Sequence, residues 1–440
     1  MFCYPWPDAP DPHSAARSLQ QRPGLVWLDG GPGLGPQGRF SFVGSDPSRE
    51  HKVEQSTPHP IEIIREIEGS IRREEDWGSS ALGIAPPLWI GYIAYDATWS
   101  PQPRREPRLH RESEREILWM GRYDALLATD HLTGDSFLVG DDEEAVARLR
   151  SHLATEPQTP MAARVHNLSA ADPDEHLAAI QRAMEHIAAG DIYQVNLARA
   201  WRAQLQGSPL ALWEKMRTAS PVPFGLYLDS GEQKVLARTM ERFLRWDRKT
   251  RELSTRPIKG TIARSGRDDG VEASTLTGDH KERAEHSMIV DLMRNDLSRV
   301  AIPGTVAVEN PLEVEPYRRL SHLVSTVRCT TQPDKTAADI LEATFPPGSV
   351  TGAPKERAIE IIEELEPMSR GVYTGALGFL DRAGGLSFAV AIRTAIAREK
   401  ELVYFAGGGL VEASVPEREV AETELKARVF LDALSTDLGA

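Results

Sequence analysis

The sequence has few of the features that mark disulfide-rich or membrane-spanning proteins. Among its 440 residues only 2 are cysteines, Cys3 and Cys329, too few for a disulfide framework or a four-thiolate zinc site. No apolar run reaches the roughly 18 residues of a membrane-spanning helix. The first residues also lack the basic segment and apolar core of a secretory signal. These absences predict a protein of the reducing cytoplasm, without a membrane partner.

Basic residues are also fewer than acidic ones, 51 against 65. The formal net charge of −14 opposes general binding to nucleic acid or to an anionic membrane surface, because neither polyanion would be attracted overall. A small anionic substrate remains compatible, since a local basic pocket can oppose the global sign. The hydrophobic share of 40% and the charged share of 26% are ordinary for a globular protein with a large core.

Two regions can be separated along the chain. Residues 1–165 are rich in proline and glycine, and their short apolar runs predict a β-rich region. A polar stretch then precedes a second region, residues 170–436. In the first region we expect strands at Gly24–Leu28, Leu88–Ala94 and Ile117–Met120, helices at Ile61–Arg73 and Asp142–Leu153, and an exposed loop at Pro101–Arg115.

The second region alternates helices and strands. Asp172 begins a helix as its N-cap, with proline at the first helical position, and the next strand, Asp191–Leu197, contains two amides, Gln194 and Asn196. Asp279 and Glu282 form a capping box at the start of another helix. Further helices are expected at Ala337–Thr344, at Pro354–Leu365 and after Ser414, and strands at Phe224–Leu228, Lys234–Arg238, Ala376–Leu380, Leu386–Ala395 and Leu402–Phe405.

Lys259 lies between two breaks in regular structure. Pro257 removes a backbone donor and Gly260 permits unusual dihedrals, so the lysine is presented at a turn after a strand. Considered alone, such a lysine is most simply a solvated surface cation. Its context decides between that interpretation and a functional one.

Two pairs of glutamates share the spacing that places side chains on one helix face. Glu282 and Glu285 form one pair, Glu419 and Glu422 the other, and Lys426 follows one turn later. Two solvated helix faces would explain this spacing. An all-oxygen Mg²⁺ site bridging the two helices would explain it equally well.

Other candidates lie near glycines or in apolar strands. The backbone N–H groups of Gly407, Gly408 and Gly409 could hold an anion, or the three glycines could simply be a flexible hairpin end. The run Ser349–Lys355 is not a Walker loop, because its glycine spacing is wrong. Arg393 is expected on an apolar strand, where a buried arginine needs a partner such as a carboxylate. His322 also lies in a predicted strand and could be an ordinary core histidine.

Together these segments resemble the chorismate-utilising enzymes, a family that contains the large components of anthranilate and aminodeoxychorismate synthases and the isochorismate synthases. The resemblance covers about residues 172–433. The matching runs are Gly190–Leu197, Arg256–Thr261, Lys281–His286, Ile289–Leu297, His322–Ser325, Gly348–Arg357, Ala391–Thr394, Ala406–Gly409, and Glu419 with Glu422 and Lys426.

Two positions distinguish members of this family. Isochorismate-type members carry lysine where this chain has Gln194, and glutamine there implies ammonia rather than water as nucleophile. Anthranilate synthases carry alanine at the position of Lys259, whereas aminodeoxychorismate synthases carry lysine. The resemblance therefore implies conversion of chorismate and ammonia to 4-amino-4-deoxychorismate, on the path to p-aminobenzoate and folate.

The resemblance also implies a fold and a site. The fold is α+β, with two stacked β-sheets covered by helices. Mg²⁺ would be held by Glu282, Glu285, Glu419 and Glu422. Lys259 would attack the ring as a covalent nucleophile, Glu241 would protonate the departing hydroxyl, and His322 would lie near that hydroxyl. Substrate would be bound by Gln194, Thr261, Thr351, Tyr373, Arg393, Gly407, Gly408, Gly409 and Lys426.

The implied partner is a separate glutamine amidotransferase subunit, because neither cysteine has the context of a glutaminase nucleophile. Two alternatives stay open. An anthranilate synthase component that carries lysine would make anthranilate and pyruvate. A catalytically silent binding subunit would result if Met240 and Pro347, which depart from the family pattern, spoil the site.

Overall fold

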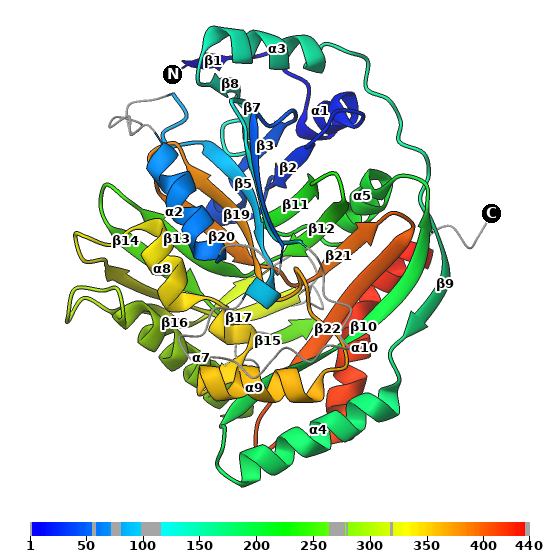
Figure 1. Ribbon diagram of the computed structural model, residues 1–440, viewed down its shortest axis with the longest axis vertical. Helices are drawn as coiled ribbons and strands as arrows, with labels where there is room; N and C mark the ends of the chain where they lie inside the picture. Colours follow the sequence, from blue (N-terminus) through cyan, green and yellow to red (C-terminus); the bar gives the residue numbers. More distant parts are fainter. Residues whose placement is uncertain are drawn as a thin grey trace.

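Two large β-sheets form the centre of the molecule. The computed structural model describes residues 2–54, 59–71, 81–97, 116–263, 278, 280–316 and 320–435. One sheet has 12 strands and the other has 10, and their neighbouring strands pair antiparallel. Helices cover the outside, so the predicted α+β class with two stacked sheets is confirmed (Figure 1).

The larger sheet, called sheet A below, mixes strands from both regions of the sequence. Its order is β1 (Phe2–Pro5), β8 (Ser136–Gly140), β7 (Ala125–Asp130), β3 (Phe40–Gly44), β2 (Val26–Asp29), β11 (Phe224–Asp229), β12 (Gln233–Thr239), β21 (Thr394–Arg398), β22 (Glu401–Leu410), β10 (Gln194–Gln206) and β18 (Gly352–Ala353), and β9 (Arg164–Ala170) also pairs with β10.

The smaller sheet, sheet B, is likewise mixed. Its order is β15 (Ile258–Ala263), β17 (Leu320–Thr330), β14 (Glu252–Arg256), β13 (Arg242–Asp247), β20 (Leu386–Val390), β19 (Ala376–Asp381), β5 (Pro87–Ile93), β6 (Glu116–Arg122) and β4 (Arg49–Glu54), with β16 (Ala307–Pro316) also paired to β17. Because β2 pairs with β11 and β5 with β19, the first 165 residues supply strands to both sheets. The domain boundary near residue 165 stays a prediction.

Nine helices complete the described part of the chain. They are α1 (Pro12–Leu19), α2 (Pro60–Ser70), α3 (Glu143–Leu153), α4 (Pro173–Ala188), α5 (Pro209–Ala219), α7 (His280–Ser298), α8 (Ala337–Thr344), α9 (Lys355–Leu365) and α10 (Pro416–Ser435), besides the short 3₁₀ turns η1 (Gly35–Gly38), η3 (Tyr95–Ala97) and η4 (Gly348–Val350). None of the helices in these ranges is long and apolar enough to cross a membrane.

Side chains at the N-cap positions explain where several helices begin, and that of Asp172 was predicted. The Asp142 carboxylate accepts the N–H of Ala145, and that of Asp172 accepts the N–H of Asp174. Thr336 and Asp339 form a reciprocal capping box at α8, so two otherwise unpaired backbone donors are satisfied. The box predicted from Asp279 lies outside the described residues, as does the predicted loop 101–115.

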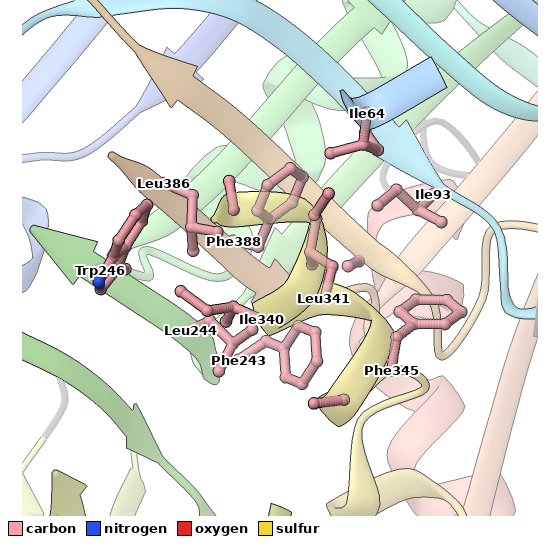
Figure 2. Packing of buried hydrophobic residues seen from close by; sticks show 14 of the residues in the cluster. Ile64, Ile93, Phe243, Leu244, Trp246, Ile340, Leu341, Phe345, Leu386 and Phe388 are labelled. Atoms are coloured by element: carbon pink, nitrogen blue, oxygen red, sulfur yellow. The ribbon is translucent and has the colours of Figure 1, made fainter. Parts of the chain in front are cut away.

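Three apolar layers separate sheets and helices. Residues of α2, α7 and α8 pack on the outer face of sheet B, while α1, α3, α5 and α10 pack on the outer face of sheet A. A third cluster, with Val26, Tyr92 and Leu377 among its members, fills the space between the sheets. Figure 2 shows the first layer, in which α8 places Ile340 and Leu341 against the β13 and β20 side chains Phe243, Leu244, Trp246, Leu386 and Phe388.

One predicted strand is wrong. The expected strand from 386 to 395 is two strands in different sheets, β20 in sheet B and β21 in sheet A. The chain crosses between them at residues 391–393, and Arg393 has a positive φ of 52°. This crossing begins at the fully buried Ala391 and contains no glycine or proline, so the sequence carried none of the usual signals of a break. Arg393 therefore lies at a corner and not within a strand.

Candidate active site

Lys259 and a glycine from the other sheet define the centre of the site. Lys259 lies in β15 of sheet B, next to a β-bulge at Gly260, whose φ is 68°. Its Nζ is 2.7 Å from the point where a Cβ of residue 409 would stand, and the same point is 3.2 Å from Gln194 Nε2. The absence of a side chain at Gly409 therefore allows the lysine amine and the glutamine amide to meet between the sheets.

An acidic helix faces the same lysine. Glu285, on α7, is 8% exposed as a residue, and its Oε2 lies 3.9 Å from Lys259 Nζ. The neighbouring His286 is also buried, and its Nε2 lies 2.7 Å from the Ser325 hydroxyl. Burial lowers the pKa of His286 to about 4, and the Lys259 charge acts in the same direction. The imidazole is therefore neutral beside the lysine at pH 7.

Glu241 has the protonation state expected of a general acid. It lies between β12 and β13 and is 5% exposed. Burial raises the pKa of its carboxyl to about 7, although a hydrogen bond with Ser349 and the charge of Lys259 oppose that rise. A carboxyl with a pKa near neutral pH keeps a substantial protonated fraction, which can donate its proton to a leaving hydroxyl.

Hydrogen bonds of Thr351 hold the loop that carries Ser349. Thr351 is fully buried, and its hydroxyl contacts the carbonyl oxygens of Pro347 and Gly348 at 3.2 Å each. Its own carbonyl accepts the N–H of Asn196 at 2.7 Å. Thr351 therefore fixes the loop with its side chain, and Ser349 is the loop residue that reaches Glu241. Nothing in the spacing of the sequence had singled out Ser349.

Two further cations, Arg393 and Lys426, lie near Lys259. Arg393 donates from Nη1 to the carbonyl of Lys426 and also hydrogen-bonds the Tyr404 hydroxyl. Lys426 donates to the Gly407 carbonyl at 3.0 Å and pairs with Glu422 at 2.7 Å. Burial lowers the pKa of Lys426, as do the charges of Lys259 and Arg393, against the effect of Glu422. Such a group of cations suits a substrate with two carboxylates.

The three glycines lie within β22 rather than after it. They pair with residues 196–198 of β10, which corrects the expected strand end at Phe405. A Cβ on Gly408 would stand 3.4 Å from Glu419 Oε2, and one on Gly407 would stand 2.9 Å from Asn196 Oδ1. Each glycine thus leaves room for a polar side chain of the site.

The carboxylates suit a magnesium ion in their chemistry. Glu285 and Glu419 are both at least nine-tenths buried, and oxygen donors on two helices are what Mg²⁺ prefers. Within the described ranges, no three His, Cys, Asp or Glu side chains already stand as a metal-binding group. For Glu282 and Thr261 the structure describes the backbone but not the side chain, so the predicted roles of these two side chains stay predictions.

Tyr373 forms an apolar wall of the site. Its ring stacks on Phe405 with centroids 5.2 Å apart, and burial raises the pKa of its hydroxyl. The adjacent Thr374 has a positive φ of 62° and accepts a bond from Arg370. Arg370 also binds Glu366 with two bonds, of 2.6 and 2.8 Å. This buried pair, which sequence reasoning missed, anchors the segment that presents Tyr373.

His322 lies on β17, which pairs with β15 on both sides of the bulge next to Lys259. It is 3% exposed and hydrogen-bonds the backbone of Gly260. Burial lowers its pKa to about 4, with the charge of Arg393 acting in the same direction. The histidine is therefore neutral and holds the bulge. Lys259 thus lies within a strand, which corrects the expected turn.

A cavity of about 250 Å³ adjoins the partners of Tyr373 and Arg370. It is formed by α4, the edge of β10 and the segment after α9, and its lining includes His176, Glu366 and Phe405. None of the side chains predicted for catalysis lines it. The cavity therefore adds no group to the site around Lys259.

Comparisons with known proteins agree with this geometry. Residues 25–432 match the family described as chorismate binding enzyme. The chain is 35% identical to anthranilate synthase component 1 of Thermus thermophilus, covering 97% of this chain and 96% of the relative. It is 32% identical to aminodeoxychorismate synthase component 1 of Escherichia coli, covering 94% of each.

A solved structure extends the likeness to three dimensions. The crystal structure of anthranilate synthase component I from Streptococcus pneumoniae superposes with a TM-score of 0.75 at 27% identity, covering 89% of this chain and 92% of that one. The chain belongs to the chorismate binding enzyme family and is an enzyme that acts on chorismate.

Proposed function

We propose that this enzyme is component I of an aminodeoxychorismate synthase, which converts chorismate and ammonia to 4-amino-4-deoxychorismate. The observation that carries the proposal is the meeting of the Lys259 amine with Gln194 over Gly409. A second support is Glu241, whose raised pKa of about 7 keeps an acid available near Lys259.

The first half-reaction uses Lys259 as a nucleophile. Its neutral amine attacks C2 of chorismate and forms a C–N bond, the two conjugated ring double bonds each shift by one position, and the C4–O bond breaks. Glu241 gives its proton to the departing hydroxyl, which leaves as water. The protein then holds a ring bonded through a protonated secondary amine, and Glu241 is a carboxylate.

The second half-reaction replaces the lysine with ammonia. Ammonia forms a bond to C4, the two ring double bonds shift back, and the C2–N bond breaks with its electron pair returning to Lys259 as a neutral amine. The new C4 ammonium gives one proton to Glu241. Chorismate and ammonia have then become aminodeoxychorismate and water, and both side chains are restored.

The remaining residues bind and orient the substrate. We assign the carboxylates of chorismate to Arg393, Lys426 and the backbone of β22, because these are the cationic and N–H groups beside Lys259. We assign a Mg²⁺ site to Glu282, Glu285, Glu419 and Glu422, where the ion would neutralise a substrate carboxylate. His322 holds the bulge next to Lys259, and Thr351 holds the loop that carries Ser349.

Ammonia would come from a separate glutamine amidotransferase subunit or from ammonium at high concentration. The two relatives compared above are both named as component 1 of a synthase, which supports a two-component enzyme. No membrane or nucleic-acid partner enters this proposal.

Anthranilate synthase component I is the second candidate, because the Thermus thermophilus relative with that name shares 35% identity over nearly the full chain. Under that alternative Lys259 would not bond the ring, and ammonia would add at C2 followed by loss of pyruvate.

Product identification decides between the two. The purified chain is incubated with chorismate, Mg²⁺ and ammonium, with and without added aminodeoxychorismate lyase. The products are separated by chromatography and identified by mass spectrometry. p-Aminobenzoate that appears only with lyase supports the proposal. Anthranilate with pyruvate in both samples refutes it. Intact chorismate in every sample, including one with an amidotransferase subunit added, indicates a silent binding subunit.

A further inference from the structure

Two side-chain amides on β10 are buried and have no hydrogen-bond partner among the residues that the structure describes. Gln194 is 1% exposed, and neither its Oε1 nor its Nε2 has a partner in those ranges. Asn196 is 8% exposed, and its Oδ1 likewise has none there. A buried polar atom without a partner costs about 1–3 kcal/mol. Two such side chains, two residues apart in a strand, therefore point to a ligand that satisfies them.

Both amides face the site from the same side of β10. Residues two apart in a strand share a face, and the register pairs Asn196 with Gly409 and Ala198 with Gly407. Asn196 Oδ1 occupies the space left by Gly407, and Gln194 Nε2 the space left by Gly409, where Lys259 Nζ also stands. The two amides thus lie in a row beside the lysine.

The polar part of this face ends at Asn196. The next two residues on the same face, Ala198 and Ala200, pack with Tyr373 and Phe405 in an apolar cluster. A small polar ligand that enters this row is therefore confined between the aromatic pair and Lys259.

We propose that Asn196 is a second acceptor that holds the ammonia nucleophile together with Gln194. This inference rests on the proposed function, because it takes ammonia as the co-substrate. Ammonia has three N–H donors and one lone pair. Two N–H donors directed at the amide oxygens of residues 194 and 196 leave the lone pair free to be aimed at the ring.

Amide oxygens suit this task better than carboxylates. A carboxylate would favour ammonium, which has no lone pair and cannot attack. A neutral oxygen accepts an N–H bond without that preference, and the nearby Lys259 disfavours a second cation. Binding by amides thus selects the reactive form without any proton transfer.

The test measures the ammonium dependence of Asn196→Ala and Asn196→Asp, each checked for folding by circular dichroism and thermal unfolding. Initial rates are recorded with saturating chorismate and Mg²⁺ while ammonium chloride is varied at several pH values. Chorismate binding without ammonium is measured by calorimetry. Val195→Ala is the matched control, because Val195 is fully buried on the other face of the same strand.

We expect Asn196→Ala to raise the KM for ammonium at least 10-fold while the Kd for chorismate changes less than 3-fold. Asn196→Asp keeps the shape of the side chain but should shift the activity to higher pH, since its carboxylate retains ammonium. Val195→Ala should lower the unfolding temperature and leave the KM for ammonium unchanged.

Three results would overturn the inference. An unchanged KM for ammonium in both Asn196 variants would show that this side chain does not hold ammonia. An equal loss of chorismate binding would make Asn196 a ligand of the ring. Absence of any aminated product from the unmodified protein, with ammonium or with an amidotransferase subunit, would refute the proposed function itself, and this inference with it.

Discussion

Lys259 and Gly409 belong to different sheets, and the lysine amine occupies the space that a side chain on residue 409 would fill. The contact joins the edge strand β15 of sheet B to β22, near one end of sheet A. It makes a glycine, which bears no functional group, a determinant of where the nucleophile stands.

Gly409→Ala should therefore impair catalysis. The added methyl group would stand 2.7 Å from Lys259 Nζ and 3.2 Å from Gln194 Nε2, so both flexible ends must move. A displacement of this size near the reacting atoms lowers kcat by about 10²-fold. Steady-state kinetics test this, with Gly69→Ala as control, since a Cβ at Gly69 of α2 meets no atom within 4 Å. Equal rates for the two variants would contradict the prediction.

Lys259→Ala should abolish formation of aminodeoxychorismate, by more than about 10³-fold, because no amine remains to open the reaction. Chorismate binding in the presence of Mg²⁺, measured by calorimetry, should persist. Mass spectrometry of the unmodified protein quenched during turnover should show the ring attached to Lys259. Undiminished turnover of the variant would eliminate the covalent step.

Glu241 should give the enzyme an alkaline limit. Since burial raises its pKa to about 7, the acid form is lost as pH rises through 7, and kcat/KM should fall there. Glu241→Gln should remove this limb and lower the rate by about 10²–10⁴-fold. Asp381→Asn is the control, because Asp381 is another buried carboxyl with a raised pKa, about 6, outside the site. If the alkaline fall in kcat/KM survives in Glu241→Gln, it belongs to another titratable side chain.

The same carboxyl affects stability with a defined sign. Its pKa is about 7 in the folded protein against an ordinary value of 4.5, so the folded state retains a proton that the unfolded state has released between these values. The contribution of Glu241 to the free energy of unfolding should therefore fall from pH 4.5 to 7 and be constant above it. Urea unfolding across this range should show less pH dependence in Glu241→Gln.

Arg370→Met should destabilise the fold by about 3–5 kcal/mol, because it leaves the Glu366 carboxylate buried without its cation. Urea unfolding measures this loss. The double variant with Glu366→Gln should recover part of it. Arg182→Met, which breaks the exposed pair of Arg182 with Glu364, should cost about 1 kcal/mol or less. Similar losses of stability for Arg370→Met and Arg182→Met would mean that the buried ion pair stabilises the fold no more than the exposed pair does.

Glu422→Gln should raise the Mg²⁺ concentration needed for half-maximal activity by about 10-fold or more, if the proposed metal site is right. Calorimetric titration with Mg²⁺ alone gives a readout independent of activity. Glu417→Gln is the control, since Glu417 is an exposed acid in the first turn of the same helix. Identical titrations for the two variants would show that α10 presents only a solvated acidic face.

Much of the secondary structure followed from local signals. The helix predicted at Ala337–Thr344 is α8 with the same bounds, the helix predicted at Asp142–Leu153 is α3, and the predicted cap at Asp172 begins α4. Caps and apolar periodicity act over a few residues, so a sequence displays them directly. The two-sheet α+β fold was predicted from family resemblance rather than from such patterns.

The tertiary structure decided how the site is assembled. The sequence named Lys259, Glu241 and Gly409 but offered no sign that Gly409 makes room for the lysine, that Ser349 bonds Glu241, or that Arg393 stands at a crossing between the sheets. The first two contacts join residues that are far apart along the chain. They depend on which strands pair and on where a side chain is missing, and neither property is a local feature of the chain.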